Sequence, residues 1–211
     1  LATSGSDNLV LLWDLTAGDP TQPIGRLVGH NGSVEFIAIS PDGRLLLSGD
    51  VLGEVRLWDL TSDGYPAILV DKETHSAEIS DVGFSGDGRF FATSDVVGDI
   101  YLWQTNEPST PIPLPLHEEY INNLDFSRDG RYLVSASDDN TAILWDLAAA
   151  DPSANPTIFD GHNDQVWYAV FSDDGRILAT ASRDRLVRLW DLTSPDPPAD
   201  PIHLSGHDAP V

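Results

Sequence analysis

The spacing between histidine and tryptophan is the feature of this sequence that most constrains its fold. Four histidine-to-tryptophan intervals have the same length of 28 residues: His30 to Trp58, His75 to Trp103, His117 to Trp145 and His162 to Trp190. The interval from a tryptophan to the next histidine is 17 residues, except for the 14 residues between Trp103 and His117. A unit with one part of constant length and one part that tolerates deletion is therefore repeated along the chain. Self-similarity at a period of 42 to 45 residues predicts a repeat architecture.

One unit read residue by residue predicts four strands. Residues 166–172, 177–182, 186–192 and 202–204 are rich in β-branched, aromatic and other apolar residues, and polar or glycine-containing turns separate them. The first turn, at 173–176, contains a glycine that suits a hairpin, and a loop rich in Asp and Pro runs from Thr193 to Pro201. The other units copy this order, and no segment has helical periodicity. Four antiparallel strands per unit predict the blade of a β-propeller.

These motifs resemble the WD40 repeat family. Gly-His, the Ser-x-Asp-Gly-Arg turn and the Trp-Asp ending recur at the family's spacing over essentially the whole chain. The resemblance implies a propeller of four-stranded blades, usually seven, that serves as a rigid platform for other proteins. The regular wording of the repeats, with Asp/Pro/Ala linkers, is similar to bacterial WD40 arrays attached to large signalling or NTPase proteins.

The repeat boundaries predict how the chain is divided. We expect an all-β segment of about five four-stranded antiparallel blades, part of a larger propeller of seven or more. Overlaying the two ends on one repeat leaves 11 positions missing, a count that does not close a seven-bladed ring. The expected units are a partial first blade at 1–29, full blades at 30–74, 75–116, 117–161 and 162–206, and the start of a further repeat at 207–211.

Composition narrows the class of partner. The formal net charge is −23, from 34 acidic against 11 basic residues. A negative field of this size argues against nucleic acid and an anionic membrane surface, and it would steer a basic protein or peptide toward the chain. The alternative is that the charge only keeps a β-rich surface soluble. We expect a cytoplasmic protein whose partners include other domains of a longer parent chain.

The sequence lacks the usual signatures of cofactor and metal sites. It contains no Cys, no phosphate-binding or dinucleotide glycine motif, and no histidine pair at metalloprotease spacing. We therefore expect no cofactor and no metal.

The WD40 resemblance implies a buried hydrogen-bonded set in each blade. Its members are the Gly-His histidine, a Ser or Thr eight residues before the tryptophan, an Asp six before it, and the tryptophan. Two units match in full: His117, Ser137, Asp139 and Trp145, and His162, Ser182, Asp184 and Trp190. In the units of Trp58 and Trp103 the aspartate stands at the earlier position, as Asp50 and Asp95, and whether it bonds the histidine is left open. A trio that recurs in several units favours a structural network over a catalytic triad.

The resemblance also implies a partner-binding face at the Gly-His loops. Two positions per unit are expected to line its central rim, namely Glu35 and Val51, Ser80 and Val96, Asn122 and Asp138, and Trp167 and Arg183. Of these, Trp167, Arg183, Val51 and Val96 are the expected anchors, because Trp and Arg are enriched at binding hot spots and these two could stack. The alternative is that Trp167 packs under a loop. The four turn arginines, at 44, 89, 131 and 176, are expected at the opposite end, either paired with local aspartates or forming a basic ring for phosphate.

The sequence therefore predicts a non-catalytic interaction platform, a scaffold or sensor module of a larger signalling protein. Two alternatives stay open at this point. One is an enzyme with an active site in the central channel, which would need a single cluster of catalytic groups outside the repeat pattern. The other is a propeller fragment that self-assembles through uncovered sheet edges and faces.

Overall fold

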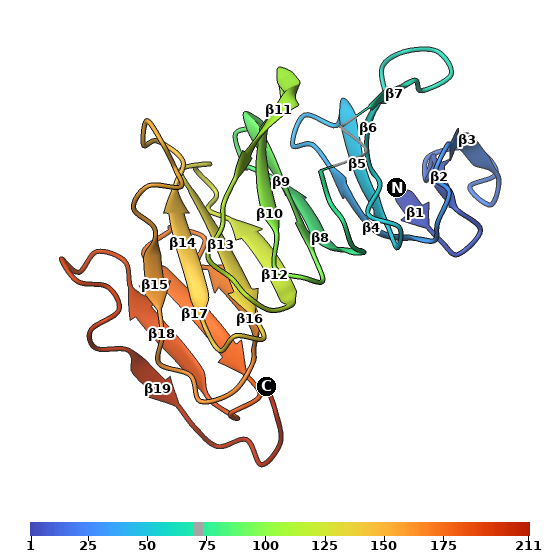
Figure 1. Cartoon of the computed structure of the whole chain (residues 1–211). Coiled ribbons are helices and arrows are strands. Elements are labelled where there is room, and N and C mark those ends of the chain that lie inside the picture. Colours follow the sequence, from blue (N-terminus) through green and yellow to red (C-terminus); the bar gives the residue numbers. More distant parts are fainter. Residues whose placement is uncertain (70–73) are drawn as a thin grey trace.

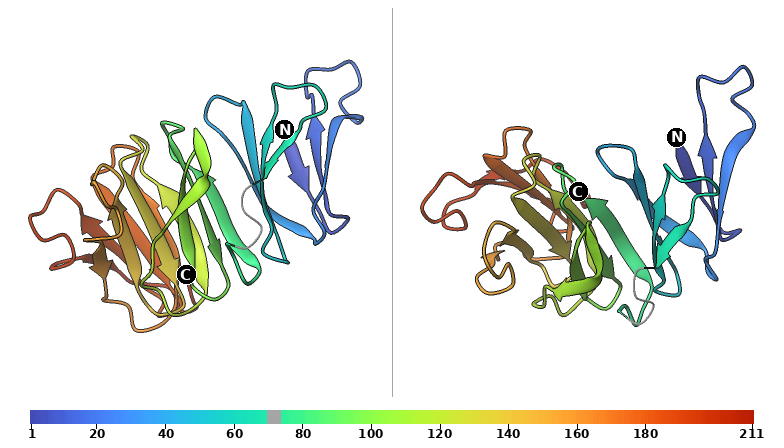
Figure 2. Two further views of the ribbon diagram at one scale, coloured as in Figure 1. Left: turned by 45° about the horizontal axis from the view of Figure 1, so that its top comes forward. Right: turned by 90° about the horizontal axis from the view of Figure 1, so that it is seen from above.

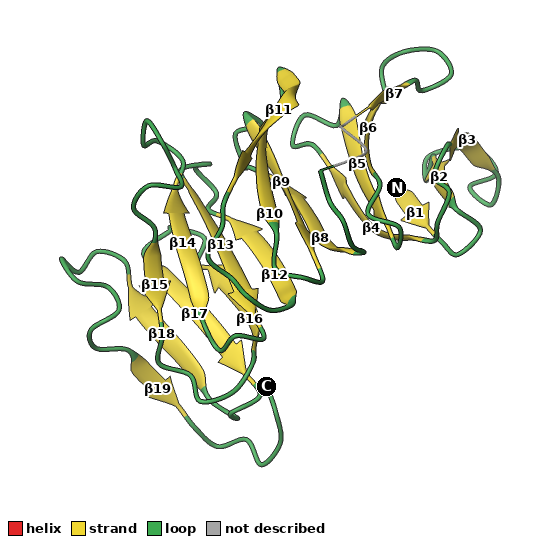
Figure 3. Ribbon diagram, in the orientation of Figure 1, coloured by secondary structure: helices red, strands yellow, loops and turns green. Residues whose placement is uncertain are grey.

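The described part of the chain is built entirely from β-strands. The structure, a computed structural model, describes residues 1–69 and 74–211, and within these residues it contains no helix. The strands form five antiparallel sheets that follow one another along the chain (Figure 3). The first sheet has three strands and the other four have four each. The predicted all-β fold with repeated antiparallel blades is thereby confirmed.

The strands have the same order in every sheet, from the inside of the array outward. The first strands of sheets two to five are β4 (Val34–Ile39), β8 (Ile79–Phe84), β12 (Ile121–Phe126) and β16 (Val166–Phe171). The second strands are β1 (Ala2–Ser4), β5 (Leu45–Asp50), β9 (Phe90–Asp95), β13 (Tyr132–Ser137) and β17 (Ile177–Ser182). The third strands are β2 (Leu9–Trp13), β6 (Val55–Asp59), β10 (Ile100–Gln104), β14 (Ala142–Asp146) and β18 (Val187–Asp191). The outermost strands are β3 (Pro23–Val28), β7 (Ala67–Leu69), β11 (Glu107–Pro113), β15 (Thr157–Phe159) and β19 (Ile202–Leu204).

A short hydrogen-bonded turn closes the hairpin between the first and second strands. In sheet two the Gly43 N–H donates to the Ser40 carbonyl oxygen at 2.8 Å, and the Ser40 hydroxyl donates to the Asp42 carboxylate at 2.7 Å. Gly43 has a φ of 72°, a value that a residue with a side chain rarely adopts. The other three hairpins repeat this arrangement at Gly88, Gly130 and Gly175. The repeated Ser-x-Asp-Gly motif therefore encodes this turn.

The hydrophobic core is divided among the seams between neighbouring sheets. Four buried clusters are present, and each joins apolar residues of one sheet to those of the next. For example, Leu47 and Leu57 of sheet two pack with Ile79 and Trp103 of sheet three. The sheets follow one another in an arc whose two chain ends lie apart (Figures 1 and 2). Each sheet buries its apolar faces only against its neighbours, which is the behaviour expected of a stacked repeat.

The five sheets lie one after another along the chain. They occupy residues 2–28, 34–69, 79–113, 121–159 and 166–204, while residues 70–73 of the expected second unit lie outside the described residues. The Val211 N–H donates to the Ser182 carbonyl oxygen at 3.2 Å, as the Val34 N–H does to the Gly5 carbonyl oxygen at 3.2 Å. Val211 thus meets sheet five in the way that the start of β4 meets sheet one.

Candidate partner-binding face

The loops that carry the repeat histidines lie at the same end of each sheet as the turns between the second and third strands. One main-chain hydrogen bond joins loop and turn in each four-stranded sheet. The N–H groups of Val51, Val96, Asp138 and Arg183 donate to the carbonyl oxygens of Ser33, Glu78, Tyr120 and Gln165, respectively, at 2.9 to 3.0 Å. We call this end of the array the Gly-His face.

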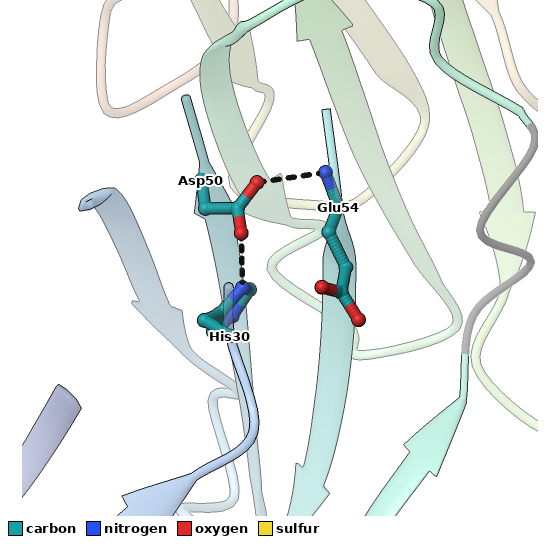
Figure 4. A group of neighbouring side chains, drawn as sticks. All are labelled: His30, Asp50 and Glu54. Atoms are coloured by element: carbon teal, nitrogen blue, oxygen red, sulfur yellow. Dashed lines mark hydrogen bonds and ion pairs between the residues drawn. The ribbon is translucent and has the colours of Figure 1, made fainter. Parts of the chain in front are cut away.

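In sheet two the imidazole of His30 lies between two polar side chains of β5. Its Nδ1 is 3.0 Å from Asp50 Oδ2, and its Nε2 is 2.6 Å from Ser48 Oγ. Figure 4 shows the His30–Asp50 pair and the Glu54 N–H, which donates to Asp50 Oδ1 at 2.9 Å. Trp58 Nε1 donates to the same Ser48 hydroxyl at 2.8 Å. These side chains are buried, and each polar group compensates another for lost hydration.

The same arrangement of histidine, hydroxyl and tryptophan recurs in the later sheets. The sets are His75, Thr93 and Trp103; His117, Ser135 and Trp145; and His162, Thr180 and Trp190. In sheet one Trp13 Nε1 donates to Thr3 Oγ1 at 2.9 Å. Sheet four differs in one respect, because the buried Trp145 Nε1 has no hydrogen-bond partner among the described residues.

The prediction that Ser137 and Ser182 contact the histidines is wrong. The Ser137 hydroxyl donates to the Glu119 carbonyl oxygen at 3.3 Å, and the Ser182 hydroxyl donates to that of Asp164 at 2.9 Å. These serines brace the Gly-His loops, while the hydroxyl that meets each imidazole stands ten residues before the tryptophan. Alternate residues of a strand share a face, so the two positions look equivalent in the sequence pattern. A signal was nevertheless present, because only the earlier position carries Ser or Thr in all five repeats.

The aspartate reaches the histidine from two different positions. In sheets four and five it stands six residues before the tryptophan, as Asp139 at 2.6 Å from His117 Nδ1 and Asp184 at 3.0 Å from His162 Nδ1. In sheets two and three it stands eight before, as Asp50 at 3.0 Å from His30 Nδ1 and Asp95 at 2.9 Å from His75 Nδ1. The earlier aspartate therefore does bond the histidine directly.

Burial governs the ionisation of this network. Loss of hydration lowers the pKa of His30 and of His162, although the aspartate beside each acts to raise it. Burial acts to raise the pKa of Asp184, but its hydrogen bonds with Arg188, the Asn163 N–H and His162 hold that pKa below its usual range. An imidazole hydrogen-bonded to a carboxylate, repeated from sheet to sheet, supports a structural role.

One part of this network has the residue types of a metal site. His30, Asp50 and Glu54 each offer a ligand atom, and these atoms lie within 4.8 Å of one another. The Arg56 guanidinium forms an ion pair with Glu54, and Asp50 already bonds His30. A fixed positive charge beside the cluster disfavours a cation, so the donor set fits an internal ion pair better than a metal.

The predicted rim residues coincide with a β-bulge in the first strand of each four-stranded sheet. The pairing register shifts at the residue that follows the first Val or Ile of β4, β8, β12 and β16. The residues at the bulge are Glu35, Ser80, Asn122 and Trp167. A bulge redirects side chains and often lies beside a functional site.

The rim residues differ in what they offer to a partner. Asn122 Nδ2 and Gln165 Nε2 each donate to the Asp138 carboxylate, both at 2.7 Å, which joins sheets four and five. Trp167 is half-buried, and its Nε1 is 3.4 Å from Gln165 Oε1. Ser80 is only 2% exposed and hydrogen-bonds Ser94, so the structure does not support it as a contact residue.

Arg183 is exposed but does not stack on Trp167. Its nearest charged neighbour is Asp164, with Nε 4.0 Å from a carboxylate oxygen. Among the described residues the cation–π contacts involve other arginines. Of the turn arginines at the opposite end, three pair with nearby aspartates: Arg89 with Asp87, Arg131 with Asp146 and Arg176 with Asp174. These contacts favour the interpretation that the turn arginines pair with local aspartates over the interpretation that they form a basic ring for phosphate.

Comparison with known proteins assigns the repeats. The family model described as "WD domain, G-beta repeat" matches residues 21–59, 69–104, 111–146 and 154–191, which is more than half of the chain. "Nuclear distribution protein PAC1" of Arthroderma otae is 40% identical over 47 residues, which are 22% of this chain and 10% of that protein. "Small ribosomal subunit protein RACK1" of Medicago sativa is 40% identical over 58 residues, which are 26% of this chain and 18% of that protein. The matches thus cover less than a fifth of either relative.

Proposed function

Since this chain belongs to the WD40 repeat family, whose members are typically non-catalytic interaction modules, we propose that its Gly-His face binds a protein or peptide partner. The repeats and the relatives support a protein-interaction scaffold in general terms. The finer proposal adds the face and the anchors. The observation that carries it is the row of bulges, which leaves Glu35, Asn122 and Trp167 of three inner strands with exposed surface at the same end of the array.

The anchors that we propose are Trp167, Arg183, Val51 and Val96. Arg183 is exposed and the other three are half-buried, so each has surface left for a partner. Trp and Arg supply a large share of binding energy at interfaces when a partner removes them from water. The exposed Glu35 and the Asn122–Asp138 pair supply polar groups around them.

The test compares Trp167→Ala and Arg183→Ala with Arg176→Ala, a control that removes an exposed arginine at the opposite end. We expect the first two variants to reduce capture of partner proteins from cells of the source organism at least tenfold, with melting temperatures close to that of the unchanged chain. The control should retain capture. If Trp167→Ala lowers the melting temperature and retains capture, Trp167 is a packing residue and the proposed anchor is wrong.

We also propose that the scaffold serves other domains of a longer protein, either by holding a complex together or by sensing a partner. Support for a scaffold in general comes from the WD40 repeats and from the similarity to RACK1 and PAC1. Sequencing the gene on both sides of the coding region for these repeats tests it. An adjoining ATPase, kinase or protease domain would support a sensor, and stop codons directly flanking the repeats would contradict the proposal.

A further inference from the structure

Two turns on the Gly-His face carry exposed apolar residues where the other repeats carry an aspartate. Leu52 is 63% exposed and Val97 is 53% exposed, and each stands six residues before its tryptophan. The matching residues in sheets four and five are Asp139 and Asp184, which bond the histidines. Sheets two and three therefore differ from their neighbours at this position of the turn.

The displaced aspartate explains why an apolar residue is tolerated there. Asp50 already reaches the histidine of its sheet from the earlier position, and its second oxygen accepts the N–H groups of Leu52 and Glu54, both at 2.9 Å. Asp95 does the same for Val97 at 3.1 Å and Asp99 at 3.0 Å. One carboxylate thus bonds both the histidine and the turn, so the side chain six residues before the tryptophan is not needed to bond the histidine.

These turns are fixed against the next sheet by glycines. Gly53 has a φ of 80°, and a Cβ there would lie 2.5 Å from the Ala77 carbonyl oxygen. Gly98 has a φ of 100°, and a Cβ there would lie 3.0 Å from the carbonyl oxygens of His117 and Glu119. Each turn therefore packs directly on the Gly-His loop of the following sheet. The exposed apolar side chains are held on a rigid backbone, which lowers the entropy cost of binding.

The apolar residues extend onto sheet four. Tyr120, which is 37% exposed, follows Glu119 in the loop that contacts Gly98. The Val96 N–H donates to the Glu78 carbonyl oxygen. Burial raises the pKa of Tyr120, and the Glu78 charge is a smaller cause in the same direction. We define Leu52, Val97 and Tyr120 as the turn patch.

Exposed acidic side chains occur in the same turns and Gly-His loops and at the start of β4. They are Glu35, Glu78, Asp99, Glu118 and Glu119. None of these five forms an ion pair with another described residue. In the described part of sheets two to four the exposed arginines lie in the hairpin turns at the opposite end, at positions 44, 89, 128 and 131. The field that the described side chains produce at the turn patch is therefore negative.

We propose that the turn patch binds a peptide segment in which apolar side chains alternate with Lys or Arg. The apolar side chains cover Leu52, Val97 and Tyr120, and the basic side chains meet the unpaired acids. This inference rests on the proposed function and deepens it. It specifies the chemistry of the partner and adds contact residues on sheets two to four of the Gly-His face.

The test measures fluorescence anisotropy of labelled ten-residue peptides with the complete chain. The first peptide alternates Leu and Lys, the second replaces Leu with Ser, and the third replaces Lys with Glu. We expect the Leu–Lys peptide to bind at least tenfold more tightly than the Ser–Lys peptide, and the Leu–Glu peptide not to bind. Equal affinity for the Leu–Lys and Ser–Lys peptides would mean a charge effect alone and would overturn the proposal.

Matched variants locate the site. The double variant Leu52→Ser with Val97→Ser should weaken Leu–Lys binding at least tenfold. The control double variant Ile24→Ser with Ile158→Ser removes apolar residues of 57% and 44% exposure elsewhere and should change it less than twofold. Unchanged binding by the first pair would overturn the inference. The proposed function fails separately, if Trp167→Ala and Arg183→Ala retain partner capture.

Discussion

A buried imidazole needs a partner at each ring nitrogen, and this requirement explains the repeated polar residues. The carboxylate at Nδ1 and the hydroxyl at Nε2 give both ring nitrogens a hydrogen-bond partner. In most sheets the tryptophan Nε1 donates to the same hydroxyl. In sheet five Asp184 also accepts from Arg188 Nη1 at 2.9 Å and from the Asn163 N–H at 3.1 Å. The Asp184 side chain thereby ties the Gly-His loop to β18.

At this scale we predict that Asp184→Ala destabilises the chain by about 1–3 kcal/mol, because it leaves buried polar partners without a hydrogen bond. The pKa of Asp184 is lowered by folding, so its contribution is present above the usual aspartate range and is lost as the pH falls through the depressed value. Urea denaturation at pH 7 measures the loss. The control Asp173→Ala removes an exposed aspartate of the same sheet and should have little effect. Equal midpoints for the two variants would argue against this network.

At the scale of strands, neighbouring sheets are linked by side chains that accept main-chain N–H groups. Asp81 of β8 accepts from the Leu124 N–H of β12 at 2.7 Å, and Asn123 of β12 accepts from the Ala169 N–H of β16 at 3.0 Å. Asp81 and Asn123 stand at equivalent positions of their repeats. The seam between sheets two and three has the apolar Phe36 at that position. The seams between sheets three and four and between sheets four and five therefore combine apolar packing with polar links, whereas Phe36 adds apolar packing to the seam between sheets two and three.

The charged link at Asp81 leads to a prediction about pH. Burial raises the pKa of Asp81 to about 6, with the nearby Asp125 charge acting in the same direction. A raised carboxyl pKa means that the stabilising contribution is full below the unfolded value near 3.8 and is lost as the pH rises through about 6. Asp81→Asn should therefore gain about 1–2 kcal/mol relative to the unchanged chain between pH 4 and pH 7, allowing for one weakened hydrogen bond.

Parallel denaturation curves at pH 4 and pH 7 measure this difference, with Glu78→Gln as a control that removes an exposed acid next to the same strand. Asn123 already makes the equivalent link with an amide, which indicates that the substitution fits. A gain of the same size for both variants would show that general charge repulsion, rather than burial of Asp81, is responsible.

At the scale of the whole molecule, the last sheet has an uncovered apolar face. The strand register aligns Tyr168 with Val187 and Leu204, and it aligns Val170 with Leu189 and Ile202. Tyr168 and Ile202 are 56% and 63% exposed. In sheet four the apolar residues of β13, β14 and β15 in the same register are buried against sheet five, namely Val134, Ala136, Ala142, Leu144 and Phe159. Exposed apolar faces of this kind favour association, which supports the alternative of self-assembly for the chain in isolation.

We predict that the isolated chain associates as its concentration rises, and that Tyr168→Ser with Val170→Ser shifts it toward the monomer. Added salt should strengthen association, because it screens the repulsion between copies of formal charge −23. Sedimentation velocity over a range of concentrations and salt levels measures both effects. The control is Val28→Ser, which removes a residue of 70% exposure on sheet one. A monomer at every concentration would contradict the prediction.

No helix in the described residues is long and apolar enough to cross a membrane. This finding stands beside the negative charge as a description of the molecule.

The sequence by itself determined the repeat, the strand order and the turn chemistry, because these depend on residues close together in the chain. A fixed interval from His30 to Trp58, copied three times, leaves little freedom for any other stacking. The tertiary structure alone decided which side chains meet. The hydroxyl that bonds His117 belongs to Ser135 and not to Ser137. Both serines lie on the same face of their strand, so only the register between distant segments decides which of them meets the histidine.

The candidate site shows the same division. The pattern placed Trp167 and Arg183 at one end of sheet five, but in the structure these two side chains do not stack, and Ser80 is buried. The structure also revealed that Leu52 and Val97 are exposed. In these two turns the carboxylate of Asp50 or Asp95 accepts the main-chain N–H groups, and the sequence pattern did not predict this contact. Local sequence therefore specified the scaffold, while contacts between distant residues specified the surface it presents.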